Sequence, residues 1–112
     1  KAKIGNTIGD IGHASQKYVE GEGFGVVRGL VGHGIGRDLW EDPQIPNYGV
    51  RHAGVKLVEG MVICIEPMVI MGGDAVKRAK DGQTFITKDG SLAAHFEDTI
   101  AVTADGAEVL TK

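Results

Sequence analysis

The stretch Met61-Val62-Ile63-Cys64-Ile65-Glu66 is a nearly continuous apolar run that ends on a carboxylate. Such a run is typical of a strand that is covered on both faces of a sheet. A carboxylate that is buried without a partner is costly, so Glu66 must be paired, protonated or bound to a cation. The run therefore predicts a central strand with a candidate site at its end. The alternative is that Glu66 faces solvent or an arginine.

The residues before this run predict one helix and then mostly irregular chain. Thr7 and Asp10 are spaced as a capping pair at the start of a helix. Apolar side chains then recur at helical spacing, which predicts a helix at residues 8–21. We further expect a short strand at 24–28, a glycine-rich turn at 32–36, a long irregular segment with prolines at 37–53, and a brief strand at 55–58.

The residues after the run predict antiparallel strands. A strand at 84–87 is followed by Lys88-Asp89-Gly90, which is typical of a hairpin turn. Residues 92–102 form the longest predicted strand, and Asp105-Gly106 predicts a turn into a last strand at 107–110. A helix followed by mostly antiparallel strands indicates an α+β domain, in which helical structure covers one face of a curved sheet.

Composition excludes several classes of function. The chain has 112 residues, which is enough for one domain with a single core. Its formal net charge of -3 provides no basic surface for nucleic acid or for an anionic membrane. No apolar run approaches the roughly 18 residues that are needed to cross a bilayer. The single cysteine, Cys64, excludes an internal disulfide and fits a reducing compartment, so we predict a cytoplasmic location.

Two further side chains could join Glu66 in a metal site. His33 lies between two glycines, whose backbone freedom would allow an imidazole to enter a pocket. Glu97 lies in the middle of the predicted strand at 92–102, on a small, polar face that it shares with His95 and that suits a cavity. One imidazole and two carboxylates suit Mn, Fe, Co or Zn. Taken singly, His33 could be an ordinary loop residue and Glu97 could face water, and Cys64 is interpreted as a small buried hydrophobe.

Short motifs extend along the whole chain in a recognisable order. They are Gly32-His33-Gly34-Ile35-Gly36-Arg37, Glu41 with Pro43, Glu59-Gly60-Met61, Ile65-Glu66-Pro67-Met68, Lys80-Asp81-Gly82, Thr87-Lys88-Asp89, Ser91, and Phe96-Glu97 with Thr99. In this order they resemble the carboxy-terminal half of the type I methionine aminopeptidases, and the resemblance covers essentially all 112 residues. The Ile-Glu-Pro-Met motif favours this family over the related Xaa-Pro peptidases.

The resemblance implies a fold, a reaction and a set of residue roles. Residues 1–112 would be a single segment that forms the carboxy-terminal half of a "pita-bread" fold, with two divalent metal ions at the middle of its curved sheet. The implied reaction is hydrolytic removal of the initiator Met from nascent chains. His33 and Glu66 resemble ligands of one metal ion, Glu66 also resembles the proton shuttle, and Glu97 resembles the carboxylate that bridges both ions.

The chain also departs from the family pattern. The resemblance places two further aspartate ligands in an amino-terminal half that has no counterpart here, so we expect at most a partial metal site. Trp40 stands where the family has a substrate-contacting histidine, and an indole cannot act as an acid, a base or a ligand. Leu39 and Gln83 stand where aromatic residues of the methionine pocket are expected.

Three functions follow from these observations. The first is a methionine aminopeptidase that acts on peptide amino termini, of which this chain is a fragment with little or no activity of its own. The second is a non-catalytic module that binds a peptide end or a protein partner, which the replacement at Trp40 favours. The third is an aminopeptidase or prolidase-like enzyme with altered specificity. A half-fold exposes a sheet edge and an apolar face, so we expect self-association or pairing with the missing half.

Overall fold

The computed structural model describes all residues from Lys1 to Lys112. One helix, α1 (Ile8–Gly21), precedes ten short strands. The strands are β1 (Gly25–Val26), β2 (Gly32–Gly34), β3 (Glu41–Ile45), β4 (Val62–Ile65), β5 (Met68–Ile70), β6 (Val76–Arg78), β7 (Phe85–Thr87), β8 (Ala93–His95), β9 (Asp98–Thr103) and β10 (Gly106–Val109). One helix with ten strands confirms the predicted α+β class.

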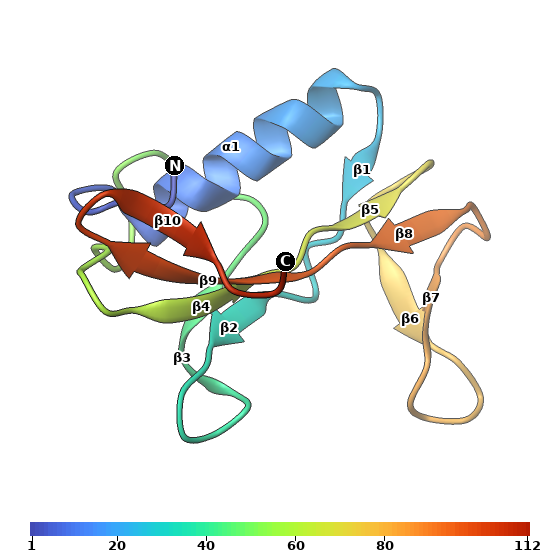
Figure 1. Ribbon diagram of the computed structural model, residues 1–112. Coiled ribbons are helices and arrows are strands. Elements are labelled where there is room, and N and C mark those ends of the chain that lie inside the picture. Colours follow the sequence, from blue (N-terminus) through green and yellow to red (C-terminus); the bar gives the residue numbers. More distant parts are fainter.

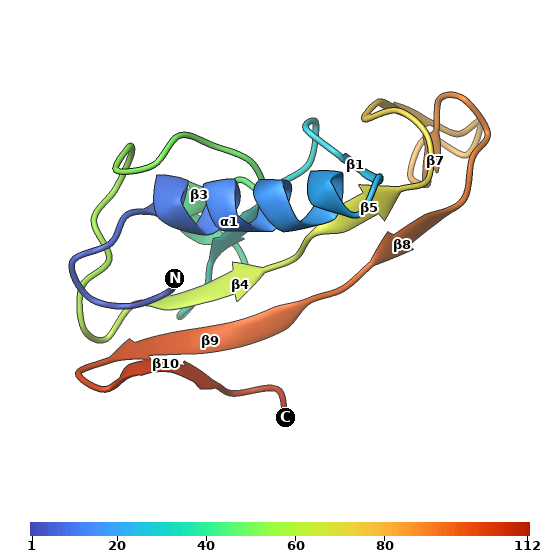
Figure 2. The same ribbon diagram turned by 90° about the horizontal axis from the view of Figure 1, so that it is seen from above.

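The strands form a five-stranded sheet in the order β10-β9-β4-β2-β3, a three-stranded sheet in the order β1-β5-β8, and the separate hairpin β6-β7. Every pairing is antiparallel. The chain passes from β4 to β5, and from β8 to β9, with only two residues between the strands. These two stretches therefore run side by side through both larger sheets, and Figure 2 shows each of them as a long ribbon.

Helix α1 covers one face of the five-stranded sheet (Figure 1). Its Ile8 and Ile11 enter the main core cluster, in which the buried sheet and loop side chains are Ile45, Leu57, Ile63, Ile100 and Val102. In β4 the core-facing Ile63 alternates with Cys64, and both are almost completely buried, at 1% exposure. This agrees with the prediction of a strand that is covered on both faces.

The ends of α1 lie where the sequence predicts them. Thr7 accepts a hydrogen bond from the Asp10 amide, and the Asp10 carboxylate accepts from the Thr7 amide, so that a complete capping box begins the helix. These hydrogen bonds lower the pKa of Asp10, chiefly through the Thr7 amide and against the opposing effect of burial. The capping pair is confirmed.

Several predicted elements between the helix and β4 are wrong. Residues 32–36, predicted as a turn, contain β2. The segment 37–53, predicted as irregular, contains β3, in which Pro43 is tolerated because β3 lies at the sheet edge. Residues 55–58, predicted as a strand, make only an isolated bridge from Lys56 to Thr7. The glycines misled the prediction, because they permit close approach of neighbouring strands as well as turns.

Differences also occur after β4. Strands β5 and β6 were not predicted, although Met68-Val69-Ile70 in β5 is itself an apolar run. The predicted strand at 84–87 is present as β7, but it pairs with β6, so residues 88–90 do not form a hairpin turn to the following strand. The predicted strand at 92–102 is divided into β8 and β9, and Glu97 lies in the interruption. The turn at Asp105-Gly106 is confirmed by the β9–β10 pairing.

The carboxylate of Asp89 anchors both ends of the β6-β7 hairpin. Its Oδ2 accepts a hydrogen bond from the Gly73 amide at 2.9 Å, and its Oδ1 accepts from the amide and the hydroxyl of Ser91 at 3.0 and 2.7 Å. Led by the Gly73 amide, these donors lower the pKa of Asp89 from 3.8 to about 2. The carboxylate therefore ties together the two chain segments on either side of the hairpin.

Helix α1 approaches the loop at residues 46–53 through a glycine. A Cβ atom at Gly12 would collide with the carbonyl oxygens of Tyr48 and Pro46. We predict that Gly12→Ala lowers the free energy of unfolding by about 1–3 kcal/mol, because overpacking against backbone outweighs a gain in helix propensity of about 1 kcal/mol. Urea unfolding should show this loss. Gly21→Ala is the matched control, since a Cβ there meets nothing within 4 Å, and an equal loss in both variants would contradict the packing argument.

The anchor at Asp89 predicts an acid-sensitive hairpin. Because its pKa is lowered in the folded state, its stabilising effect is present above pH 3.8 and is lost as the pH falls toward about 2. Amide hydrogen exchange, corrected for the intrinsic rate, should show falling protection of β6 and β7 over this range. Asp89→Asn should reduce the protection of these amides near neutral pH and should make that protection less dependent on pH. Asp105→Asn, in an exposed turn, should behave as the unmodified chain.

Candidate metal centre

The face of the five-stranded sheet opposite to α1 holds the candidate centre. Cys64 in the middle of β4 lies directly between His33 of β2 and Thr99 of β9. Because Ile63 points into the core below the helix, the alternation of strand side chains puts Cys64 and its two neighbours on the other face. The register of three adjacent strands therefore forms one row of polar side chains.

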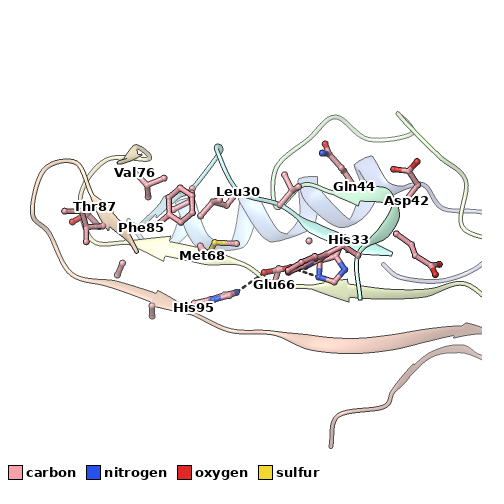
Figure 3. A pocket seen from close by; sticks show the side chains of 18 residues that line it. Leu30, His33, Asp42, Gln44, Glu66, Met68, Val76, Phe85, Thr87 and His95 are labelled. Carbon is pink, nitrogen blue, oxygen red and sulfur yellow. Dashed lines mark hydrogen bonds and ion pairs between the residues drawn. The ribbon is translucent and has the colours of Figure 1, made fainter. Parts of the chain in front are cut away.

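Glu66 lies just beyond the end of β4, with its side chain only 12% exposed. Its Oε1 is 3.5 Å from His33 Nε2, and its Oε2 is 3.1 Å from His95 Nε2. Figure 3 shows the carboxylate between the two rings. The Asn47 side chain donates a hydrogen bond to the backbone carbonyl of Glu66 at 3.1 Å and so supports this residue from behind.

The hydrogen bond made by Nδ1 of His33 determines whether Nε2 carries a proton or a lone pair in the neutral ring. Nδ1 lies 2.8 Å from the carbonyl oxygen of Gly34 and donates to it, since a carbonyl can only accept. In the neutral ring Nε2 then presents a lone pair toward Glu66. A lone pair and a carboxylate oxygen at 3.5 Å are two acceptors that face each other. A cation between them removes this conflict, so the donor set fits a divalent metal ion.

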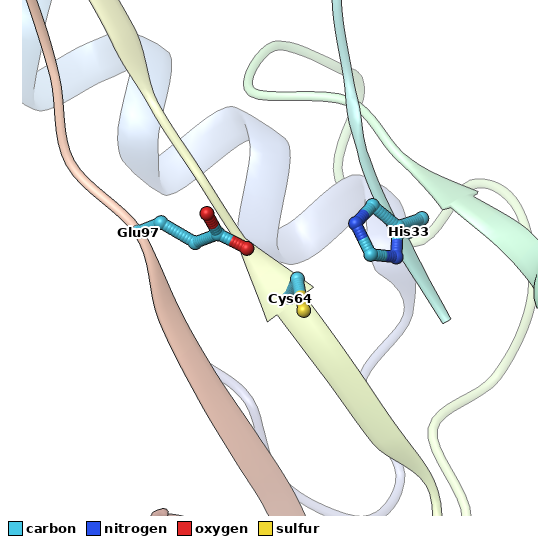
Figure 4. A group of neighbouring side chains, drawn as sticks. All are labelled: His33, Cys64 and Glu97. Carbon is cyan, nitrogen blue, oxygen red and sulfur yellow. The ribbon is translucent and has the colours of Figure 1, made fainter. Parts of the chain in front are cut away.

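Glu97 completes the cluster from the interruption between β8 and β9. Its carboxylate forms one group with His33 and Cys64, and a second with Glu66 and His95. Within each group the potential ligand atoms lie within 4.8 Å of one another, and Figure 4 shows the first group. The fold therefore brings His33, Glu66 and Glu97 together from distant parts of the chain, although their roles as ligands stay a prediction.

The Cys64 thiol is buried beside these carboxylates. Burial raises its pKa, the neighbouring charges of Glu97 and Glu66 act in the same direction, and the hydrogen bond with Thr99 at 3.4 Å opposes them. The thiol is thus neutral near pH 7, in agreement with its interpretation as a small buried hydrophobe. Its proximity to His33 and Glu97 was not predicted, because the apolar run around it gave no sign of a polar face.

A pocket of about 840 Å³ lies beside the cluster. Figure 3 shows its apolar wall, to which Met68, Leu30 and Phe85 contribute. Trp40 also lines it, with 74% of the residue exposed and its ring edge-on to that of His33 at 6.3 Å. Leu39 and Gln83 are exposed and do not line the pocket. The predicted contact of these three residues with substrate stays a prediction.

His95 is the site residue to which the sequence argument assigned no role. It comes from β8, opposite Met68 of β5, and it contacts Glu66 directly. The available signal was its spacing, because a residue two positions before Glu97 lies on the same face of an extended chain. That face was predicted to be polar, but a histidine without a matching motif gave no reason to single it out.

Comparison with known proteins identifies the family. Residues 1–104 match the model of metallopeptidase family M24. The chain belongs to metallopeptidase family M24. The chain spans less than half the length of the curated relatives that it matches. It is 55% identical to a methionine aminopeptidase of Clostridium acetobutylicum over 99% of this chain and 44% of the relative. It is 53% identical to methionine aminopeptidase 1 of Bacillus subtilis over 100% of this chain and 45% of the relative.

Solved structures of methionine aminopeptidases agree with the fold. The chain superimposes on the crystal structure of the methionine aminopeptidase from Thermotoga maritima with a TM-score of 0.96 and 55% identity, over 98% of this chain and 44% of that one. The predicted fold, half of a pita-bread architecture, is therefore confirmed. No helix of the chain is long and apolar enough to span a membrane.

The buried thiol gives a test of this geometry. We predict that Cys64 in the native chain reacts with a thiol reagent at pH 8 at least about tenfold more slowly than in the chain unfolded by guanidinium, because burial limits access and raises the pKa. Cys64 is the only cysteine, so a colorimetric assay reports on it alone. Equal rates in the native and unfolded chain would show that the thiol is open to solvent and would contradict this arrangement.

Proposed function

We propose that residues 1–112 form the carboxy-terminal half of the catalytic domain of a methionine aminopeptidase. The observation that supports this most directly is the convergence of His33, Glu66 and Glu97 beside an apolar pocket. Similarity to proteins named methionine aminopeptidase along the whole chain gives the reaction class. The proposed substrate is the amino terminus of a peptide or nascent chain that begins with Met, in the cytoplasm.

In this proposal His33 and Glu66 would hold one divalent metal ion, and Glu97 would contribute a carboxylate ligand to the two-ion centre that the family resemblance implies. The ions are Co, Mn, Fe or Zn, because imidazole and carboxylate ligands suit these borderline metals. When bound, paired ions lower the pKa of water and polarise a carbonyl group. Glu66 accepts a proton from the attacking water and passes it on, and His95 beside its Oε2 keeps that carboxylate in place.

The pocket next to the metal ligands suits an apolar side chain. Met68, Phe85, Leu30 and Trp40 are among the residues that line it. We propose that this pocket receives the methionine side chain, which brings its scissile peptide close to Glu66. Leu39 and Gln83, exposed in this chain, would contact substrate only after a rearrangement or in the presence of the missing half.

The two remaining metal ligands are proposed to be aspartates of the amino-terminal half. Without them Glu97 alone would reach the second ion, so the isolated chain would have little or no activity. Leu92 and Phe96, on the β8 side of the site, are 74% and 67% exposed. Pairing with the missing half, or with a second copy, would remove such apolar surface from water.

One observation favours a second candidate, a non-catalytic module that binds a peptide end. Trp40 places a large, exposed indole edge-on to the ring of the candidate ligand His33, with the ring centroids 6.3 Å apart, in a position where the family resemblance requires a histidine. An indole can stack on a peptide and donate one hydrogen bond, but it cannot transfer a proton. Tight binding of a peptide in the presence of chelator, without turnover, would support this module.

The catalytic proposal predicts metal-dependent release of Met. The chain would be combined with the amino-terminal half of a relative, loaded with Mn or Co, and assayed on a peptide that begins with Met-Ala. We expect turnover that chelator abolishes, and a decrease of at least about 100-fold in kcat/KM for Glu97→Gln, since loss of a direct ligand exceeds the cost of losing an outer partner.

Glu108→Gln, an exposed change on β10, is the matched control and should retain full activity. Peptides that begin with Leu or with Xaa-Pro separate a methionine enzyme from one of altered specificity. Absence of metal-dependent release in the combined protein, with both halves folded, would rule out the catalytic proposal.

A further inference from the structure

His95 stands at the candidate metal centre without a role in the proposed reaction other than contact with Glu66. Its Nε2 is 3.1 Å from Glu66 Oε2, on the side of the carboxylate opposite to His33. Its side chain is 50% exposed, whereas that of Glu66 is 12% exposed. The imidazole therefore lies at the solvent side of the cluster, where an ion could reach it.

The change of pairing partner along the β8–β9 stretch brings His95 and Glu97 toward the same point. His95 pairs with Met68 in one sheet, and Asp98 pairs with Ile65 in the other. Two residues separate the sheets on each stretch, Glu66 and Pro67 on one and Phe96 and Glu97 on the other. The one backbone hydrogen bond between these two pairs runs from the Phe96 amide to the Pro67 carbonyl at 3.2 Å. As a result the ligand atoms of Glu66, His95 and Glu97 lie within 4.8 Å of one another.

This group differs from a surface ion pair in the number of donors that converge. One imidazole nitrogen and two carboxylate oxygens face a common space, and His33 Nε2 lies 3.5 Å from the other oxygen of Glu66. His33 belongs to the other group, with Cys64 and Glu97. One nitrogen and two oxygen donors are the three protein ligands of an open Zn or Co site, in which water takes the fourth position. A mutual repulsion between the two carboxylates, which burial of Glu66 increases, is relieved when a cation binds.

We propose that His95 is a metal ligand, and that with Glu66 and Glu97 it gives this chain a site for one divalent ion, Zn or Co, without residues from outside the chain. The inference rests on the proposed function, because it concerns the same centre. It places a set of three ligands within residues 1–112, so that binding of one ion does not depend on the missing half.

Titration of the chelator-stripped chain with Co tests this proposal, because the visible absorption of Co reports the number and kind of its ligands. We expect one ion per chain. We expect His95→Gln, which retains a hydrogen-bonding amide but lacks an imidazole, to weaken binding at least about tenfold and to change the spectrum, since even outer partners contribute that much. His95→Asp, which restores a ligand, should recover most of the affinity.

His13→Gln, on helix α1, is the matched control and should leave affinity and spectrum unchanged. Circular dichroism establishes that each variant is folded, and His95→Asp serves as the second variant if His95→Gln is not. An unchanged affinity and spectrum in His95→Gln would show that His95 is only an ion-pair partner and would overturn the proposal. Absence of Co or Zn binding by the unmodified chain would overturn it as well.

The outcome is separable from that of the proposed reaction. If the combined halves release Met while His95→Gln binds Co as tightly as the unmodified chain, then only the role of His95 is wrong. If the combined halves are inactive while binding of Co by the chain depends on His95, then the metal site stands and the aminopeptidase proposal fails.

Discussion

The pairing of β4 on both of its edges is the constraint on which the rest of the structure depends. Because β2 and β9 are both in register with β4, Ile63 is fixed toward the helix and Cys64 toward the opposite face. A slip of one residue would exchange these faces, burying the polar row and exposing the core. The same register places His33 and Thr99 on either side of Cys64 and leads the chain into Glu66 at the end of the strand. The core and the candidate metal centre are therefore two faces of one strand, and neither can be moved without the other.

Much of the fold was predictable where the local signal and the tertiary structure agree. The capping pair at Thr7 and Asp10 defined the helix, and the apolar run defined β4. The prediction failed where one residue type permits two structures. Gly32 and Gly34 were interpreted as turn residues, but in β2 they allow the backbones of β3 and β4 to come close. The interruption between β8 and β9 was not predicted either. It arises because β8 pairs with β5 whereas β9 pairs with β4, and such a change of partner does not alter the alternation of polar and apolar residues along the chain.

Only part of the candidate centre was predicted, for a similar reason. His33, Glu66 and Glu97 were identified because each is a metal-capable residue in an unusual local context, and family resemblance linked them. Their convergence follows from strand order, which the sequence does not reveal directly. His95 was placed on the face of Glu97 but was given no role, and Cys64 was not predicted as a neighbour of the site, because a half-exposed histidine and a buried thiol are common elsewhere. Their importance appears only when the strands that carry them are seen to meet at Glu66 and Glu97.

The interruption shared by the two long ribbons has a mechanical consequence. Glu66 and Glu97 lie where each ribbon leaves one sheet and enters the other, so the gap between their carboxylates varies with any shear of the two sheets. An ion bound by both carboxylates would link the two stretches and would oppose such sliding. The apolar wall of the pocket, borne partly by β5 and the β6-β7 hairpin, lies on the far side of this joint. Binding of an ion at the centre would therefore also make the adjoining pocket more rigid.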